Sequence, residues 1–315
     1  MSTLPERRVV YCPPFFHAFV DLFGPIVVKE RRTQLKRWGV IFTCATVPAV
    51  YLDVVNTLET DSFLNCFFRF GGRRGYPRTL TSDRGTNFIG AAKELRDATK
   101  DFDHSKVSNS MAKQGTEWIF HLPKASHMNG AVERFIGSVK QALPIVLQGQ
   151  VLTQETLTTS IAIVESTLNN RPLSTPSDDP QDLTVLTPNS FLIQRASSTP
   201  QMSNVEDREI NSRKRHRQSV ALANMFWHRW RREYLPGLII RPKWTSETRN
   251  LAENDVVLLV EANKPRDHWP LGRVVQVHPS EYGRVRKVDV KTQSGFLTRP
   301  VTKLCLLKEA AMSQR

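Results

Sequence analysis

The first two thirds of the chain alternate between two patterns of hydrophobic positions. Short apolar runs rich in β-branched and aromatic residues predict strands, and apolar residues three and four positions apart predict amphipathic helices. The expected strands are 14–23, which the following Gly24-Pro25 should end, 37–44 and 49–55 as a hairpin, 78–82, and 118–122. The expected helices are 60–71, 89–99, 130–146 and 155–169. Strands and helices mixed in this order predict an α/β domain.

The last third of the chain has a different texture. A polar segment rich in Ser, Thr and Pro predicts a linker. It leads into a helical pattern at 213–234 whose apolar side carries Val220, Ala223, Phe226, Trp227 and Trp230. Four β-like runs follow, 255–260, 272–278, 285–292 and 297–306, separated by glycine-containing turns. Several short strands at this spacing predict a small β-barrel.

The sequence indicates neither secretion nor membrane insertion. Its longest apolar stretch, 38–55, is broken by polar residues and by Pro48, whereas a membrane helix needs roughly 20 nearly uninterrupted apolar residues. The first eight residues lack the apolar core of a signal peptide. The cysteines are far apart with no Cys-x-x-Cys pair, so we expect buried free thiols at Cys12, Cys44, Cys66 and Cys305. We therefore expect a soluble intracellular protein with no membrane partner.

Positive charge is concentrated in one short segment. The formal net charge of the 315 residues is +14, yet residues 1–211 carry 23 Lys and Arg against 21 Asp and Glu. Residues 212–243 carry 9 against 1, including the cluster Arg213, Lys214, Arg215 and Arg217. Such focused charge is typical of a polyphosphate partner. A solvated helix face and a nuclear localisation signal are the other readings of this cluster.

Three acidic residues stand where metal chemistry would need them. Asp21 lies in an apolar strand, Asp83 follows another strand, and Glu133 opens a helix. Each alone is more often a cap or turn residue, but an isolated buried carboxylate is costly and needs a partner or a metal. Three converging carboxylates repel one another unless divalent metal neutralises them. Hard oxygen ligands favour Mg²⁺ or Mn²⁺, and two such ions about 4 Å apart can clamp an in-line phosphoryl displacement.

The motifs around these acids resemble the Asp-Asp-Glu triad of retroviral-type integrases. They are Phe-Val-Asp-Leu-Phe-Gly-Pro at 19–25, Ser-Asp-Arg-Gly-Thr-Asn-Phe at 82–88 and Gly-Ala-Val-Glu-Arg at 130–134. The flanking segments 36–42 and 169–173, with 269–274 and 299–304 near the C-terminus, are similar to BEL/Pao-type retrotransposon integrases. The likeness runs from Leu4 to about Lys308. Each motif alone is unspecific, but together and in this order they are specific.

The resemblance implies a metal-dependent enzyme that joins the 3′ ends of element DNA to target DNA. In such integrases Asp21 would contact both of two Mg²⁺ or Mn²⁺ ions, Asp83 one of them, and Glu133 the other. Asn87 matches a family residue near the site, and Asn129 takes a position where relatives carry Gln. Lys140, on nearly the same helix face as Glu133, matches a contact to the element's DNA end. The implied partners are element DNA ends, target DNA and further copies of the chain, with a nuclear location at the integration step.

The resemblance also suggests domain limits. We expect an N-terminal linker remnant at 1–14, an RNase H-like catalytic core at 15–198, a linker with a basic helix at 199–249, and an SH3-like DNA-binding domain at 250–315. Departures from the family are Gly137 where many relatives have Lys, Arg84 where Asn is usual, and Val132 where Trp is general. The zinc-binding module that normally precedes the core is not seen, which suggests a fragment or a domesticated copy.

Several residues compete for these roles. Glu117 is 34 residues from Asp83, close to the retroviral spacing, but it precedes a strand, so Glu133 is the expected third ligand. We expect His17, His121 and His127 to be structural, because this chemistry uses carboxylates. Trp227 and Trp230 could stack on bases, although core packing is the simpler expectation.

Three function classes fit these features. The leading hypothesis is a polynucleotidyl transferase with endonuclease ability, and the alternative is a catalytically silent DNA-binding protein derived from an integrase. An RNase H or exonuclease on the same scaffold is disfavoured, because a bare nuclease needs neither the basic helix nor the β-rich tail.

Overall fold

The computed structural model describes most of the chain as two compact units. The described residues are 11–83, 102–121, 130–175, 185–194, 214–238, 249–261, 266, 268–280 and 283–310. One unit comprises residues 1–169 and 204–227, and the other comprises 170–203 and 228–315. The predicted helix 89–99 and the positions Arg84, Asn87, Asn129 and Arg213 lie outside the described residues.

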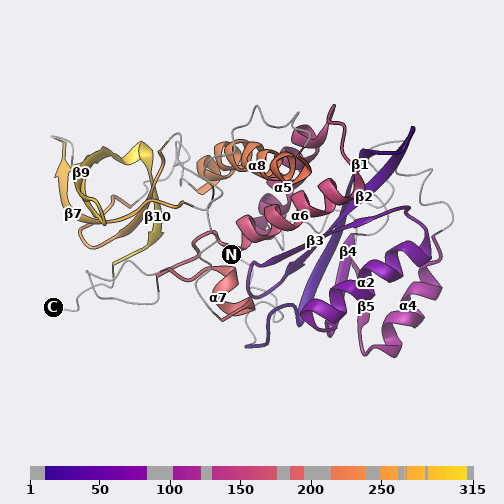
Figure 1. The fold of residues 1–315 in the computed structure, drawn as a ribbon. Helices are drawn as coiled ribbons and strands as arrows, with labels where there is room; N and C mark the ends of the chain where they lie inside the picture. The colour runs from indigo at the N-terminus through magenta and orange to yellow at the C-terminus, as the bar shows by residue number, and fades with distance from the viewer. Residues whose placement is uncertain are drawn as a thin grey trace. The chain divides into compact units, whose positions relative to one another are not determined.

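A five-stranded mixed sheet forms the centre of the first unit (Figure 1). Its strands are β1 (His17–Glu30), β2 (Thr33–Cys44), β3 (Val50–Val55), β4 (Thr79–Asp83) and β5 (Glu117–His121), in the order β3-β2-β1-β4-β5. β1, β2 and β3 are antiparallel neighbours, as the predicted hairpin requires, whereas β4 pairs in parallel with both β1 and β5. The mixed α/β class expected from the sequence is therefore confirmed.

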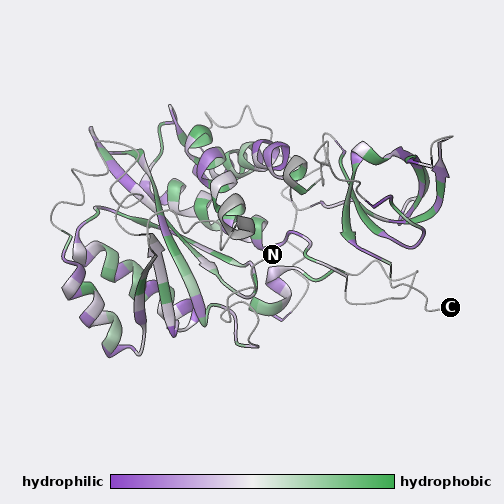
Figure 2. Ribbon diagram, turned by 180° about the vertical axis from the view of Figure 1, so that it is seen from behind, coloured by the Kyte–Doolittle hydropathy of each residue, from purple (hydrophilic) through white to green (hydrophobic). Residues whose placement is uncertain are grey.

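Helices flank this sheet. They are α2 (Thr60–Arg74), α4 (His104–Lys113), α5 (Gly130–Leu147), α6 (Gln154–Asn169) and the first part of α8 (Arg215–Leu238). Figure 1 shows α2 and α4 on one side of the sheet and α5 and α6 on the other. Figure 2 shows hydrophobic residues along the central strands and hydrophilic residues on the outward turns of α2 and α4. This layered arrangement buries the apolar faces of α2, α4, α5 and α6 against the sheet, whereas α8 meets α6, where Ser219 donates to the carbonyl of Thr156.

The expectation that Gly24-Pro25 ends the first strand is wrong. β1 continues to Glu30, and its pairing with β2 shifts register between Phe23 and Ile26. Gly24 has a φ of 124°, which side chains rarely adopt, and proline has no N–H to offer a ladder. The register shift accommodates both residues, so the strand bends there and goes on pairing.

Aromatic residues fill the core between the sheet and α2. Phe42 and Phe70 stack with ring centroids 4.3 Å apart, and Phe15 meets Phe70 edge to face at 5.4 Å. Gly39 faces Phe23 across β1 and β2, and a Cβ there would lie 2.0 Å from the Phe23 ring. Glycine at this position therefore makes room for the aromatic ring on the neighbouring strand.

Side chains cap the free edge of β3. Asn169 of α6 accepts from the N–H of Val50 at 2.9 Å and donates to its carbonyl at 2.8 Å. Glu165, also on α6, accepts from the N–H of Leu52, and Arg69 of α2 donates to the carbonyl of Val54. These contacts take the place of a further strand, so the edge is closed to strand addition at these positions.

The second unit contains a five-stranded antiparallel sheet with its own core. Its strands are β6 (Val256–Leu259), β7 (Leu271–Pro279), β8 (Val285–Thr292), β9 (Gly295–Pro300) and β10 (Leu304–Lys308), in the order β10-β6-β7-β8-β9. Val257, Val274, Val288 and Val290 are fully buried at its centre. The last predicted run, 297–306, is split into two strands by a 3₁₀ turn at Val301–Lys303.

Two short helices were not expected from the sequence. α4 is mostly polar, and only Val107 and Met111 are buried, so its apolar pattern is too sparse to recognise. α7 (Pro188–Leu192), in the second unit, has five residues and begins at a Thr187–Ser190 capping box. Within the described part of the chain, every helix is too short or too polar to cross a membrane.

The cysteines are free thiols, as expected. Cys44, Cys66 and Cys305 are buried, and burial raises the pKa of Cys305 to about 11. Cys12 is only partly buried; it lies before β1, and its thiol is 3.6 Å from the hydroxyl of Thr46.

Candidate active site

The pairing of β1 with β4 sets two candidate ligands side by side. The two strands are parallel, and Val20 on β1 pairs with Ser82 on β4. The next residue on β1 is Asp21, and the next on β4 is Asp83. Neighbouring strands in a sheet are about 4.8 Å apart, so the backbone brings these two positions to the same level of adjacent strands.

The carboxylate of Asp21 is paired with a positively charged side chain. The Lys140 ammonium from α5 donates to Asp21 Oδ2 at 2.7 Å, and the N–H of Leu22 donates to Oδ1 at 2.8 Å. The side chains of Asp21 and Lys140 are 22% and 27% exposed, so the pair is partly shielded from water. A nearby positive charge stabilises a partly shielded carboxylate, and here the ammonium of Lys140 supplies that charge.

Glu133 lies on the helix that carries Lys140. The two residues are seven positions apart in α5, which is two turns, so they lie on nearly the same helix face about 10 Å apart along the axis. Lysine side chains on helices lean toward the N-terminus, the direction in which Glu133 lies. The side chains of Asp83 and Glu133 lie outside the described residues, so the geometry of these two candidates is limited to their backbone positions.

Glu117 and Asp83 are at opposite ends of the paired strands β5 and β4. Glu117 is the first residue of β5 and pairs with Thr79, whereas Asp83 pairs with His121. Four residues along a strand span about 13 Å. Asp83 and Asp21 are at one end of β4 and Glu117 is at the other, which argues against Glu117 as a third ligand.

The surroundings of Asp21 suit a divalent cation. The described residues contain no cluster of three His, Cys, Asp or Glu side chains, but the carboxylates of Asp83 and Glu133 are not among them. Asp21 offers a hard oxygen ligand, the kind that Mg²⁺ and Mn²⁺ prefer. The Lys140 ammonium occupies the place of a cation at Oδ2. Asp21 therefore has the donor chemistry that such an ion requires, and its Oδ2 is paired with Lys140.

The other predicted DNA contacts are at the start of α8. Lys214 and Arg215 are exposed and Arg217 is partly exposed. Arg215 lies 3.4 Å from Glu155, and because both side chains are more than half exposed, this ion pair leaves the arginine accessible. Gly137, which departs from the integrase-like sequence pattern, is on α5 with open space where a side chain would be.

The tryptophans of α8 pack into protein cores. Trp227 and Trp230 are both fully buried, which confirms core packing over base stacking. Within the second unit, Trp230 stacks on Tyr234 at 4.4 Å and meets Trp269 edge to face. His17 forms a 2.7 Å hydrogen bond with Thr79 and links β1 to β4, as expected of a structural residue.

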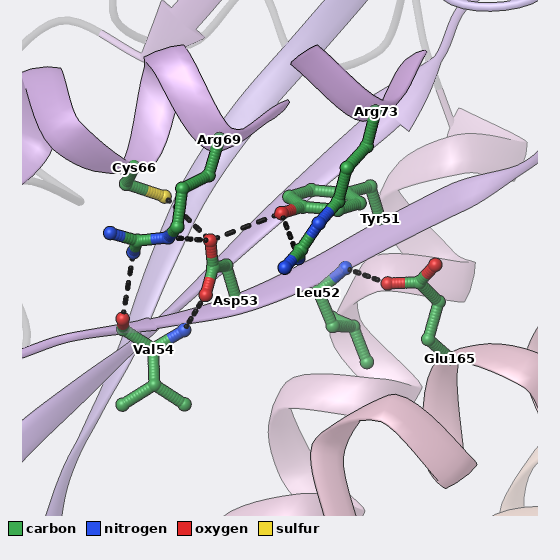
Figure 3. Close-up of polar contacts among 8 residues, drawn as sticks. All are labelled: Tyr51, Leu52, Asp53, Val54, Cys66, Arg69, Arg73 and Glu165. Atoms are coloured by element: carbon green, nitrogen blue, oxygen red, sulfur yellow. Dashed lines mark hydrogen bonds and ion pairs between the residues drawn. The ribbon is translucent and has the colours of Figure 1, made fainter. Parts of the chain in front are cut away.

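A second polar cluster, beside β3, was not recognised in the sequence (Figure 3). Asp53 accepts from Arg69 at 2.8 Å and from the Tyr51 hydroxyl at 3.1 Å, and Glu165 is paired with Arg74 at 2.6 Å. Burial raises the pKa of Glu165 despite the nearby Leu52 N–H and Arg74. The signal that could have revealed the cluster is Asp53 itself, an acid inside the apolar run 49–55 that needs a buried partner.

Comparisons with known proteins cover the chain unevenly. Residues 214–307 match a family of unknown function, DUF5641, over the span from the start of α8 to β10. No curated protein matches the chain. One solved structure, described as a simian T-cell lymphotropic virus intasome in complex with PP2A regulatory subunit B56 gamma, contains a chain that is 11% identical. The match covers 100% of this chain and 85% of that one, with a TM-score of 0.36, which does not establish a shared fold.

Proposed function

We propose that the chain is a BEL/Pao-type retrotransposon integrase that joins element DNA 3′ ends to target DNA. The observation that carries the proposal is the strand pairing of β1 with β4, which aligns Asp21 with Asp83 while a lysine of α5 reaches Asp21. Glu133 is on that same helix. The mixed sheet flanked by helices supports an RNase H-like core, and the antiparallel sheet of the second unit supports an SH3-like tail domain.

In this proposal the three carboxylates hold two Mg²⁺ or Mn²⁺ ions. Such ions stabilise the attacking and leaving oxygens of an in-line phosphoryl displacement. The N–H of Leu22 would orient Asp21, because it donates to one oxygen of that carboxylate. Lys140 would leave Asp21 and pair instead with a backbone phosphate of an element DNA end. The basic start of α8 would bind DNA backbone, and homo-oligomers acting in the nucleus would bring two DNA ends together.

A strand-transfer assay on short duplex DNA tests this function. Asp21→Asn, Asp83→Asn and Glu133→Gln should each abolish Mg²⁺-dependent nicking and joining, because each removes a metal ligand. Glu117→Gln is the matched control and should keep nearly full activity, since Glu117 is at the far end of the β4–β5 pair. Activity lost in Glu117→Gln and kept in Glu133→Gln would overturn the assignment of the third ligand.

The alternative function is a silent DNA-binding protein derived from an integrase. The concentration of charge at 212–243 favours DNA binding under either function. The two functions differ in one measurement. If the wild-type chain binds duplex DNA but neither nicks nor joins it with Mg²⁺ or Mn²⁺, the silent function is correct.

A further inference from the structure

A cavity of about 340 Å³ opens beside the free edge of β3, between α2 and α6. Tyr51 and the buried side chains of Leu52, Val54 and Ile161 form its apolar wall. Arg73 and Arg74 contribute positive charge from the end of α2, and Thr158 and Ala162 are exposed residues on the α6 side. Its volume is in the range of sites that hold small molecules.

The acceptors of this cluster are already engaged. Both oxygens of Asp53 accept hydrogen bonds, one from the N–H of Val54 and the other from Arg69 and Tyr51. Both oxygens of Glu165 accept as well, from the N–H of Leu52 and from Arg74. The guanidinium groups that form ion pairs with these two carboxylates are those of Arg69 and Arg74.

Arg73 is hydrogen-bonded to Tyr51 and feels the charge of Glu165 without forming an ion pair with it. Its Nη1 donates to the hydroxyl oxygen of Tyr51 at 2.9 Å, as Figure 3 shows, and its guanidinium carbon lies 5.9 Å from the centre of the Tyr51 ring. That hydroxyl donates its own proton to Asp53, so it remains a neutral acceptor. Within the described part of the chain, no carboxylate forms an ion pair with Arg73. Three arginines here face two carboxylates, and the excess charge is on Arg73.

We propose that this cavity binds a small oxyanion with an apolar body, a phosphate monoester or a carboxylate, and that Arg73 holds the oxyanion. A guanidinium presents its donors as a planar fork that matches two oxygens of either group. Because Tyr51 already orients Arg73, little conformational freedom is lost on binding. The apolar wall would take the body of the ligand. The cavity is beside β3, which β2 separates from β1 and β4, the strands of Asp21 and Asp83, and it does not depend on the proposed integrase function.

Calorimetric titration of the full chain tests the site with four probes. Phenyl phosphate and benzoate each combine an oxyanion with an apolar ring, and the probe that binds more tightly identifies the preferred oxyanion. Inorganic phosphate has only the oxyanion and benzyl alcohol has only the apolar ring. Each should bind at least about tenfold more weakly than the preferred probe. Arg73→Gln should weaken the preferred probe by about tenfold or more, because a charge-assisted pair of hydrogen bonds is lost.

Two further variants separate the cavity from general charge effects. Ala162→Trp adds a large side chain at the exposed rim on α6, so it should weaken binding by filling the cavity. Arg32→Gln removes the same charge as Arg73→Gln from an exposed turn and should bind like wild type. The proposal is overturned if Arg73→Gln and Ala162→Trp both bind like wild type. It is also overturned if Arg32→Gln loses as much affinity as Arg73→Gln, or if inorganic phosphate binds as well as phenyl phosphate.

Discussion

Lys140 and Asp21 form an ion pair in which a helix lysine supplies positive charge to a candidate metal ligand. A lysine at 2.7 Å and a divalent ion cannot both occupy the same side of one carboxylate oxygen. If metal binds Asp21 through Oδ2, the lysine would have to move, and the free energy of the ion pair would reduce the metal affinity. The same movement would free the ammonium for a phosphate of DNA.

Lys140→Met should therefore tighten Mn²⁺ binding by about tenfold, which corresponds to the loss of a competing interaction of about 1.4 kcal/mol. Electron paramagnetic resonance of free Mn²⁺ measures this affinity without any catalytic step. Lys106→Met is the matched control, because Lys106 pairs with Asp61 at 2.8 Å on an exposed surface, and it should bind Mn²⁺ like wild type. An unchanged affinity in Lys140→Met would show that Mn²⁺ does not bind at Asp21.

The carboxylate of Asp255 ties together the two ends of the described β-rich segment. It is fully buried and accepts two hydrogen bonds from Arg249, one from the N–H of Ala252 and one from the N–H of Ala310. Burial by itself raises the pKa of Asp255, but Arg249 and the two N–H groups outweigh it and hold the pKa below the ordinary 3.8. A lowered folded-state pKa stabilises the fold above the ordinary pKa, and this stability is lost as pH falls through the folded value.

Asp255→Asn should lower the free energy of unfolding at pH 7 by about 2 kcal/mol, because the charge-assisted bonds are lost. Its stability should also fall less than that of wild type from about pH 4 downward, since the titrating group is gone. Urea unfolding at several pH values measures both effects. Glu253→Gln, an exposed neighbour, should match wild type at every pH. Equal acid sensitivity in Asp255→Asn and wild type would contradict the role given to this carboxylate.

At the scale of elements, β3 shows how a strand at the edge of a sheet is satisfied by helices. The N–H groups of Val50 and Leu52 point away from β2 and are met by Asn169 and Glu165 of α6. Asn169 is 1% exposed. Its side chain also donates to the carbonyl of Val50, so it both accepts from and donates to the strand. The last turn of α6 thus takes part in the hydrogen bonding of the sheet.

Asn169→Ala should destabilise the protein by about 2–4 kcal/mol, because it leaves a buried N–H and a buried carbonyl of Val50 without partners. The free energy of unfolding in urea measures the loss. Asn65→Ala is the control, since Asn65 is exposed on α2 and the same substitution should change stability by less than about 0.5 kcal/mol. Similar effects of the two substitutions would mean that the edge contact contributes little.

At the scale of the whole molecule, the charge distribution divides the chain into a nearly neutral part and a basic part. Residues 1–211 carry 23 positive and 21 negative side chains, and 212–243 carry 9 and 1. DNA binding through phosphates releases counterions, so affinity falls with salt, with a log–log slope of about −0.9 per phosphate contacted. The basic start of α8 should account for much of that slope.

Replacing Arg213, Lys214, Arg215 and Arg217 together by Gln should weaken duplex binding and flatten the salt slope by about three units. Fluorescence anisotropy over a series of salt concentrations measures both quantities in the full chain. A matched variant that replaces Arg7, Arg8, Arg31 and Arg32 loses the same charge and should keep the wild-type slope. If the first variant keeps its slope but no longer enters nuclei, the cluster serves transport instead of DNA binding.

The sequence by itself determined the features that depend on local patterns. Apolar runs rich in β-branched and aromatic residues located β2, β3 and β8, and helical spacing located α2 and α6, all to within a few residues. Residue type and neighbours also singled out Asp21, Asp83, Glu133 and the basic cluster as candidates. Elements with weak apolar patterns, such as α4 and α7, were missed for the same reason.

Only the tertiary structure decided how distant segments meet. The parallel pairing of β1 with β4 aligns Asp21 with Asp83, and the register of β5 separates Glu117 from them. The ion pair of Lys140 with Asp21 joins residues 119 positions apart. Strand register and contacts of this kind depend on packing across the whole sheet, where a shift of one residue would turn buried side chains outward. No local pattern carries that information.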